Sequence, residues 1–172
     1  YHINDYKLGY ESSLYFLKNN KPESDDYHEI LSWYKIFDKL LKYTGEKIIK
    51  NTFNKPVFIF CCDGGFEPWT GSNILHKGVG GSETYIIEMA RYIQANNLFK
   101  TIVFCNTPNK KDEIFENTLY THIDNYYEFI NTTCVHTCVI SRFSEYLPVT
   151  NKSFVENIYL MLHDLSASGN VI

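Results

Sequence analysis

The stretch P-V-F-I-F-C, Pro56 to Cys61, decides the fold class of this chain. Its apolar run is too short for a buried helix and consists of strand-forming residues, which predicts a β-strand covered on both faces. Comparable runs predict further strands over Thr101–Cys105, Thr118–Ile123, Val135–Ser141 and Ile158–Leu162. The chain is therefore expected to form a largely buried sheet.

Helical patterns separate several of these strands. Glu83 to Ala95 follows the first strand, and Asp124 to Asn131 lies between the third and the fourth. Alternating strands and helices predict an α/β fold, a Rossmann-like parallel sheet flanked by helices. Ligands of such sheets gather beyond the carboxyl ends of the strands. Polar residues at those ends, among them Asp63, Arg142 and His163, are expected along one edge of the sheet.

The residues before the first strand follow a different pattern. Tyr6–Asn19 and Tyr27–Tyr43 carry apolar residues at helical spacing, and Pro22 interrupts them, which predicts a helical hairpin. We expect residues 1–54 to form this hairpin and residues 55–172 to form the Rossmann-like domain. The run L-G-Y-E-S-S-L-Y-F-L-K-N-N-K-P also resembles the second half of a tetratricopeptide (TPR) unit. A hairpin lying against the main domain and a remnant of a longer repeat array both remain open.

Composition excludes several classes of partner. The formal net charge of the 172 residues is −4 and no Lys/Arg cluster stands out, so nucleic acid is not an expected partner. No apolar run reaches the roughly 18 residues of a membrane span. The first residues lack the basic and then apolar form of a signal peptide. We therefore expect a cytoplasmic location.

The five cysteines are an odd number, and most lie in apolar strand-like runs, as reduced core thiols do. The alternative is the stretch C-V-H-T-C from Cys134 to Cys138, where His136 lies between two thiols. Zinc sites normally need a second ligand pair at defined spacing, and none is present in the sequence. We expect buried thiols and no requirement for a metal.

The stretch between the first strand and the helix that follows it holds six of the nine glycines. The dinucleotide pattern G-x-G-x-x-G fails here because Glu83 falls where the last glycine belongs, and no P-loop pattern is present. Gly80, Gly81 and Ser82 open the helix, and their backbone N–H groups suit an anion. The alternative is that Ser82 is only an N-cap and Glu83 a favourable first-turn acid.

The stretch G-V-G-G-S-E-T-Y-I-I-E-M-A-R resembles the G-G-x-E helix opening of the retaining glycosyltransferases of family 4. The likeness extends to one strand that ends C-V-I-S-R and another that ends L-M-L-H-D-L, and it covers about Pro56 to Ile172. Members of that family have the GT-B fold, in which two Rossmann-like halves face a cleft. The resemblance implies that this chain contains the first half, the acceptor-side wall of that cleft.

The resemblance also implies roles for residues at the helix opening. Gly80 and Gly81 would offer backbone N–H groups to the phosphates of a nucleotide-sugar donor, with Ser82 and Glu83 beside them at the helix start. Arg142, at a strand end, would contact phosphate or acceptor as a fixed charge. A strand-end arginine that only pairs with a nearby acid is the alternative interpretation.

Two further positions complete the expected site. His163 and Asp164 would lie near the reacting sugar, although a histidine that merely bonds to Asp164 or to a loop backbone explains the pattern as well. The stretch D-G-G-F-E-P-W, Asp63 to Trp69, is expected to shape the acceptor pocket, with simple packing as the alternative for Trp69.

The predicted function is transfer of a sugar from a nucleotide-sugar donor to a glycan, protein or small-molecule acceptor. The second half of the GT-B fold carries an acidic E-x7-E element, and no two glutamates of this chain stand at that spacing. We therefore expect these residues alone to be inactive without a C-terminal half of the same chain. The alternative function is a non-catalytic binding module that holds a protein partner through the TPR-like hairpin. A hydrolase is disfavoured because the G-x-S-x-G elbow is absent.

Overall fold

The computed structural model describes residues 3–22, 25–42, 49–64, 67–151 and 153–163. The chain divides into two compact units, Tyr1–Lys47 and Ile48–Ile172. The backbone N–H groups of Lys50 and Asn51 donate to the carbonyl of Thr132, so these two residues belong with the second unit. Each unit is described by itself.

The first unit is the expected helical hairpin, with helices α1 (Ile3–Asn19) and α2 (Asp25–Lys42). Aromatic residues hold the two helices together. The rings of Tyr10 and Tyr34 stack with 4.9 Å between centroids, and their hydroxyls lie 3.1 Å apart. Gly9 faces Phe37 so closely that an added Cβ would lie 2.6 Å from the ring. A small residue at position 9 therefore lets the helices approach.

The second unit contains a six-stranded sheet in the order β3-β4-β2-β1-β5-β6. Its strands are β1 (Val57–Cys62), β2 (Lys100–Cys105), β3 (Glu113–Phe115), β4 (Thr118–His122), β5 (Val135–Ser141) and β6 (Val155–Met161). All neighbouring pairs are parallel except β3 with β4. The α/β class and the mostly parallel, Rossmann-like sheet are thus confirmed.

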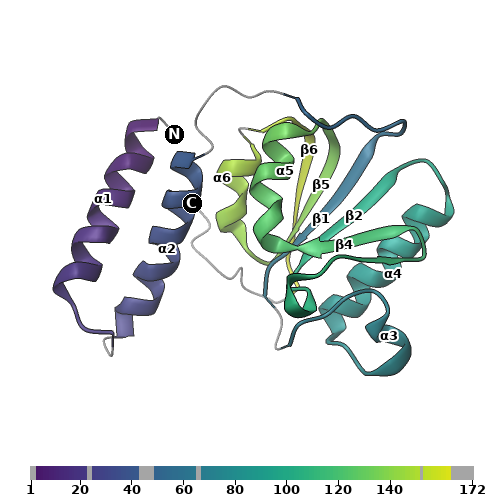
Figure 1. Ribbon diagram of the computed structural model, residues 1–172, viewed down its shortest axis with the longest axis horizontal. Helices are drawn as coiled ribbons and strands as arrows, with labels where there is room; N and C mark the ends of the chain where they lie inside the picture. The colour runs from purple at the N-terminus through teal and green to yellow at the C-terminus, as the bar shows by residue number, and fades with distance from the viewer. Residues whose placement is uncertain (1–2, 23–24, 43–48, 65–66, 152, 164–172) are drawn as a thin grey trace. The chain divides into compact units, whose positions relative to one another are not determined.

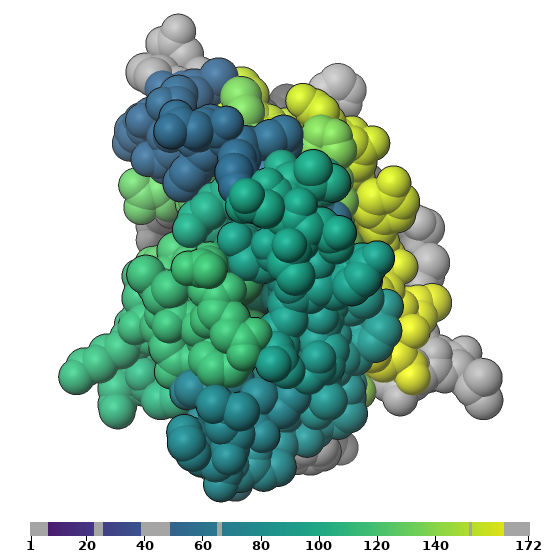
Figure 2. All heavy atoms as spheres, turned by 90° about the vertical axis from the view of Figure 1, so that its right-hand side faces the viewer, coloured from purple at the N-terminus to yellow at the C-terminus, as the bar shows by residue number. Residues whose placement is uncertain are grey.

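Helices cover both faces of this sheet (Figure 1). They are α3 (Asn73–His76), α4 (Gly81–Ala95), α5 (Tyr126–Thr132) and α6 (Leu147–Thr150), with 3-10 turns at Pro108–Lys110, Ile123–Asn125 and Ser144–Tyr146. α3 and α4 lie on one face, and α5 and α6 lie on the other. Figure 2 shows the side of α3 and α4, with β6 emerging beside them. No helix among the described residues combines the length and apolar character needed to cross a bilayer.

The main apolar core lies between α4 and the sheet. Ile86, Ile87 and Ala90 recur at helical spacing on α4 and are almost completely buried against Phe60 of β1 and Val103 of β2. Burial of each large side chain contributes about 1.5–3 kcal/mol. This packing fixes the direction of α4, and so places the first turn of α4 near the carboxyl end of β1.

Several elements escaped prediction because they are short or polar. β3 pairs with β4 through a tight turn in which Glu116 and Asn117 both have positive φ, 47° and 63°. Such turns are normally signalled by Asn-Gly, and Glu-Asn carries no such signal. β6 begins at Val155 rather than at Ile158, because an edge strand tolerates polar residues that a buried strand does not.

Gly71 packs against two aromatic rings, and its replacement tests the packing there. A Cβ at Gly71 would lie 2.6 Å from ring atoms of both Phe115 and Tyr120, whereas a Cβ at Gly78 would meet nothing within 4 Å. Overpacking costs roughly 1–3 kcal/mol. We therefore expect Gly71→Ala to lower the free energy of unfolding in urea by that amount, and Gly78→Ala to leave it nearly unchanged. Equal stability of the two variants would contradict this packing.

Candidate functional site

The carboxyl ends of β1 and β5 form the centre of the candidate site. These strands are neighbours, with Cys61 opposite Ile140, yet the sheet extends from β1 to β2 and β4 on one side and from β5 to β6 on the other. The order of the strands therefore reverses between β1 and β5. In open parallel sheets such a reversal leaves a crevice in which ligands bind.

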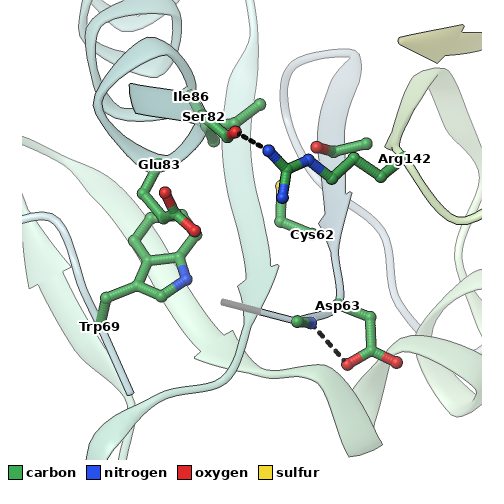
Figure 3. A pocket seen from close by; sticks show the side chains of 9 residues that line it. Cys62, Asp63, Trp69, Ser82, Glu83, Ile86 and Arg142 are labelled. Carbon is green, nitrogen blue, oxygen red and sulfur yellow. Dashed lines mark hydrogen bonds between the residues drawn. The ribbon is translucent and has the colours of Figure 1, made fainter. Parts of the chain in front are cut away.

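A pocket occupies this position. It is a small cavity of about 20 Å³ within a hollow of about 270 Å³ that includes space open to solvent. Its lining comes from the end of β1, the loop before α3, the first turns of α4 and the end of β5: Cys62, Asp63, Gly64, Trp69, Ser82, Glu83, Ile86, Ser141 and Arg142 (Figure 3). The pocket thus joins residues that lie far apart in the sequence, such as Cys62 and Arg142. Arg142 is the one cationic side chain among these lining residues.

Arg142 turns sharply at the end of β5. Its φ of 67° lies in the left-handed region, and its backbone N–H donates to the carbonyl of Met161 at 2.9 Å. The guanidinium Nη2 donates to Ser82 Oγ at 2.6 Å (Figure 3). Arg142 lies at the carboxyl edge of the sheet, as expected. Its charge lies at the first turn of α4.

The start of α4 differs from the N-cap interpretation. Gly80 occupies the N-cap position, and Ser82 lies within the helix, where its hydroxyl accepts from Arg142. The expectation that Ser82 is the N-cap is therefore wrong. The carboxylate of Glu83 folds back over Gly80, since a Cβ there would lie 2.1 Å from Glu83 Oε2. A side chain at position 80 would therefore shift this flexible carboxylate.

Gly81 is the first residue of α4 and has open space around it. A Cβ at Gly81 would meet nothing within 4 Å, and its φ is not positive. Gly81 is therefore no left-handed turn residue. Its backbone is accessible at the helix terminus, where N–H groups lack intrahelical partners and the helix dipole favours negative charge.

Asp63 is held away from Arg142. Its carboxylate accepts hydrogen bonds from the Gly64 N–H at 2.9 Å and from the Tyr146 hydroxyl. Figure 3 shows the carboxylate directed away from the guanidinium. Asp63 therefore connects β1 to the 3-10 turn that contains Tyr146, and it leaves the guanidinium side of the pocket to other groups.

His163 follows β6 at the same edge of the sheet. Its Nε2 lies 2.9 Å from Ser141 Oγ, and its ring meets Tyr85 of α4 edge-on with 6.2 Å between centroids. The structure thus brings His163 to the side of the pocket, where it contacts Ser141. Asp164 lies outside the described residues. Ser141 was expected with Arg142 at the end of its strand, but the sequence alone did not pair it with His163.

The cysteines are mainly core thiols, as expected. Four are buried and Cys134 is exposed. Burial raises the pKa of Cys62, which lines the pocket, well above its ordinary value, so this thiol is a poor nucleophile. In the C-V-H-T-C stretch, Cys138 is buried beside the Tyr126 hydroxyl and His136 Nδ1 lies 2.8 Å from Thr137 Oγ1. The described residues contain no cluster of three or more side chains suited to a metal.

A second hollow adjoins the pocket along the loop before α4. It encloses about 560 Å³, including space open to solvent, and is lined by Glu67, Pro68, Trp69, Lys77, Gly78, Val79, Gly80 and Glu83. Lys77 and Glu67 pair at 2.8 Å on its exposed rim. Trp69 and Glu83 line both hollows, so these two side chains separate them.

Comparison with known proteins gives no matching family model, no matching curated protein and no matching solved structure. The geometry of the pocket is therefore the basis for any functional assignment.

Glu145, beside this site, gives a pH-dependent test. Burial raises the pKa of its carboxyl above the ordinary 4.5, and the nearby Asp63 charge raises it further. A raised folded-state pKa gives stability that is fully present below pH 4.5 and is lost as pH rises through the raised value. We expect Glu145→Gln to melt at a higher temperature than the parent chain at pH 7, with the difference shrinking towards pH 4.

The matched control is Glu128→Gln, because Glu128 is exposed on α5. A Glu145→Gln variant that melts no higher than the parent at pH 7, or whose gain is constant across this pH range, would contradict the burial of this carboxyl.

Proposed function

We propose that this chain is the first Rossmann-like half of a retaining glycosyltransferase with the GT-B fold. We further propose that the pocket at the carboxyl ends of β1 and β5 receives a phosphate group of a nucleotide-sugar donor. The observation that carries the proposal is the bond between Arg142 and Ser82. It places a permanent cation at the amino terminus of the 15-residue helix α4, beside the crevice where ligands of such sheets bind.

The donor phosphate has two sets of partners in this proposal. The guanidinium of Arg142 offers planar, charge-assisted hydrogen bonds, which suit phosphate oxygens. The backbone N–H groups of Gly81 and Ser82 offer further donors at the positive end of the helix dipole. The open space at Gly81 supports such an approach, because no side chain there blocks an anion.

Glu83 opposes this anion. Its carboxylate lies over Gly80 at the same helix terminus and acts as an internal anion. We propose that the donor phosphate displaces the carboxylate of Glu83 when it binds. Affinity for the phosphate is then reduced by the free energy needed to move this side chain.

The acceptor is proposed to approach from the side of His163. The imidazole lies between Ser141 and Tyr85 at the carboxyl edge of the sheet, where it can reach a sugar placed over the pocket. The nucleotide itself is proposed to bind mainly to a second Rossmann-like half, because the described residues form one such sheet. We therefore expect this chain alone to bind phosphate groups weakly and to transfer no sugar.

A non-catalytic binding module is the second candidate. The helical hairpin is a compact unit of its own, and it exposes two large side chains of α1, Leu8 and Tyr15, which are one heptad apart. Such a face suits a protein partner. Titration with a nucleotide sugar separates the two candidates, since a module of this kind gives no saturable binding.

Arg142→Asn tests the proposed phosphate site. Asparagine tolerates positive φ better than most residues, so the turn after β5 is expected to persist without the charge. Loss of one charge-assisted hydrogen bond should weaken binding of inorganic pyrophosphate by about tenfold to a hundredfold in isothermal titration calorimetry. The control is Arg91→Asn. Arg91 lies further along α4, where it pairs with Glu88 of the same helix and with Glu116 of the turn between β3 and β4. Equal losses in both variants would indicate a general charge effect and contradict the site.

Glu83→Gln tests the internal anion. Removing the negative charge while keeping the shape should tighten pyrophosphate binding by about fivefold, since a like charge no longer repels the ligand. Glu88→Gln is the control, because it removes the same charge from the exposed face of the same helix. Weaker binding by Glu83→Gln would show instead that this carboxylate contacts the ligand favourably.

A further inference from the structure

Trp69 lines the pocket and is deeply buried, yet its side chain carries a polar N–H group. Its side chain is only 3% exposed. Its indole Nε1 is completely buried and finds no hydrogen-bond partner within the part of the chain that the structure describes. Figure 3 shows the nitrogen on the edge of the ring that faces the interior of the pocket.

The position of this indole is fixed by the surrounding core. The Trp69 backbone N–H donates to the carbonyl of Asn106 at 2.9 Å, and its carbonyl accepts from Cys105 Sγ at 3.4 Å. The ring meets Tyr120 edge-on with 6.3 Å between centroids. Trp69 is therefore anchored to the end of β2, and its N–H cannot turn outward to water without disturbing these contacts.

A carboxylate also fixes the loop that follows Trp69. Glu113 accepts hydrogen bonds from the hydroxyls of Thr70 and Ser72, each at 2.9 Å, and from the Ser72 N–H at 3.0 Å. The backbone after the tryptophan is thus held from β3. A binding group that is preorganised in this way loses little freedom when a ligand arrives.

A buried N–H without a partner destabilises a protein, whereas phenylalanine would fill most of the same space without a polar group. The indole N–H needs an acceptor, and the pocket is where one can enter. The ring lines the same pocket as the first turns of α4 and Arg142 (Figure 3). An acceptor in this position is favoured if it is an anionic oxygen.

We propose that the Trp69 indole N–H donates a hydrogen bond to a phosphate oxygen of the ligand in this pocket, which makes Trp69 a binding residue. This inference rests on the proposed function, which supplies a ligand that contains phosphate. It adds a donor opposite the helix terminus, so that the phosphate is held from the α4 side and from the loop side. Binding there completes the hydrogen bonding of a core residue.

The chain contains only two tryptophans, Trp33 in α2 and Trp69, so its spectrum of indole N–H groups is simple. In ¹H–¹⁵N correlation spectra, Trp33→Phe assigns the signal of Trp69 by elimination. Titration with inorganic pyrophosphate should move the Trp69 indole proton downfield with the same Kd as calorimetry gives, while the Trp33 signal stays fixed. Nucleoside diphosphates, titrated next, should move the same signal if their diphosphate group is the source.

Trp69→Phe, compared with Trp33→Phe, gives the second measurement. We expect Trp69→Phe to weaken pyrophosphate binding by about tenfold with a melting temperature close to that of the parent, and Trp33→Phe to leave binding unchanged. Saturable binding without movement of the Trp69 signal, or with equal affinity in Trp69→Phe, overturns the role of Trp69 and leaves the proposed function standing. Absence of pyrophosphate binding by the parent chain overturns both. If Trp69→Phe does not fold, the spectra of the parent decide.

Discussion

The placement of β1 beside β5 is the constraint on which the candidate site depends. Each strand is parallel to the other, but their following segments leave the sheet towards opposite faces, α4 on one side and the turn before α6 on the other. Because the two segments diverge, the carboxyl ends of β1 and β5 cannot be covered by either of them. The crevice is thus a consequence of strand order, and the residues that follow the strands determine its chemistry.

Arg142 illustrates how this constraint affects local structure. A non-glycine residue in the left-handed region costs of order 1–3 kcal/mol. The backbone bond to Met161 of β6 and the side-chain bond to Ser82 of α4 offset this cost. The strained turn directs the guanidinium across the crevice instead of along β5. Strain is therefore found where the two halves of the sheet meet, beside the amino terminus of α4.

The sheet could be predicted from the sequence because its central strands are buried on both faces. Continuous apolar runs such as Pro56–Cys61 and Ile102–Cys105 have few other interpretations between glycine-rich and polar segments. β3 could not be predicted, because three residues carry no period and Glu116-Asn117 is an unusual turn pair. The helical hairpin was predictable for the opposite reason, since its helices are long and strongly periodic.

The place of the site residues at one edge of the sheet could be predicted from the strand pattern, but their contacts could not. The bond between Ser82 and Arg142 joins residues that are 60 positions apart, so no local pattern signals it. Glu83 was expected as a first-turn acid and does lie there, yet its approach to Gly80 depends on the exact path of the chain into α4. Trp69 could be assigned to packing as easily as to binding, because only the structure shows that its N–H is buried without a partner among the described residues.

A crystal structure of this chain with inorganic pyrophosphate would test the central claim most directly. We expect the anion between the first turn of α4 and the guanidinium of Arg142, with an oxygen within hydrogen-bonding distance of Trp69 Nε1 and with the Glu83 carboxylate moved away from Gly80. Pyrophosphate bound instead beside Lys77 in the second hollow, with Glu83 still over Gly80, would contradict the account.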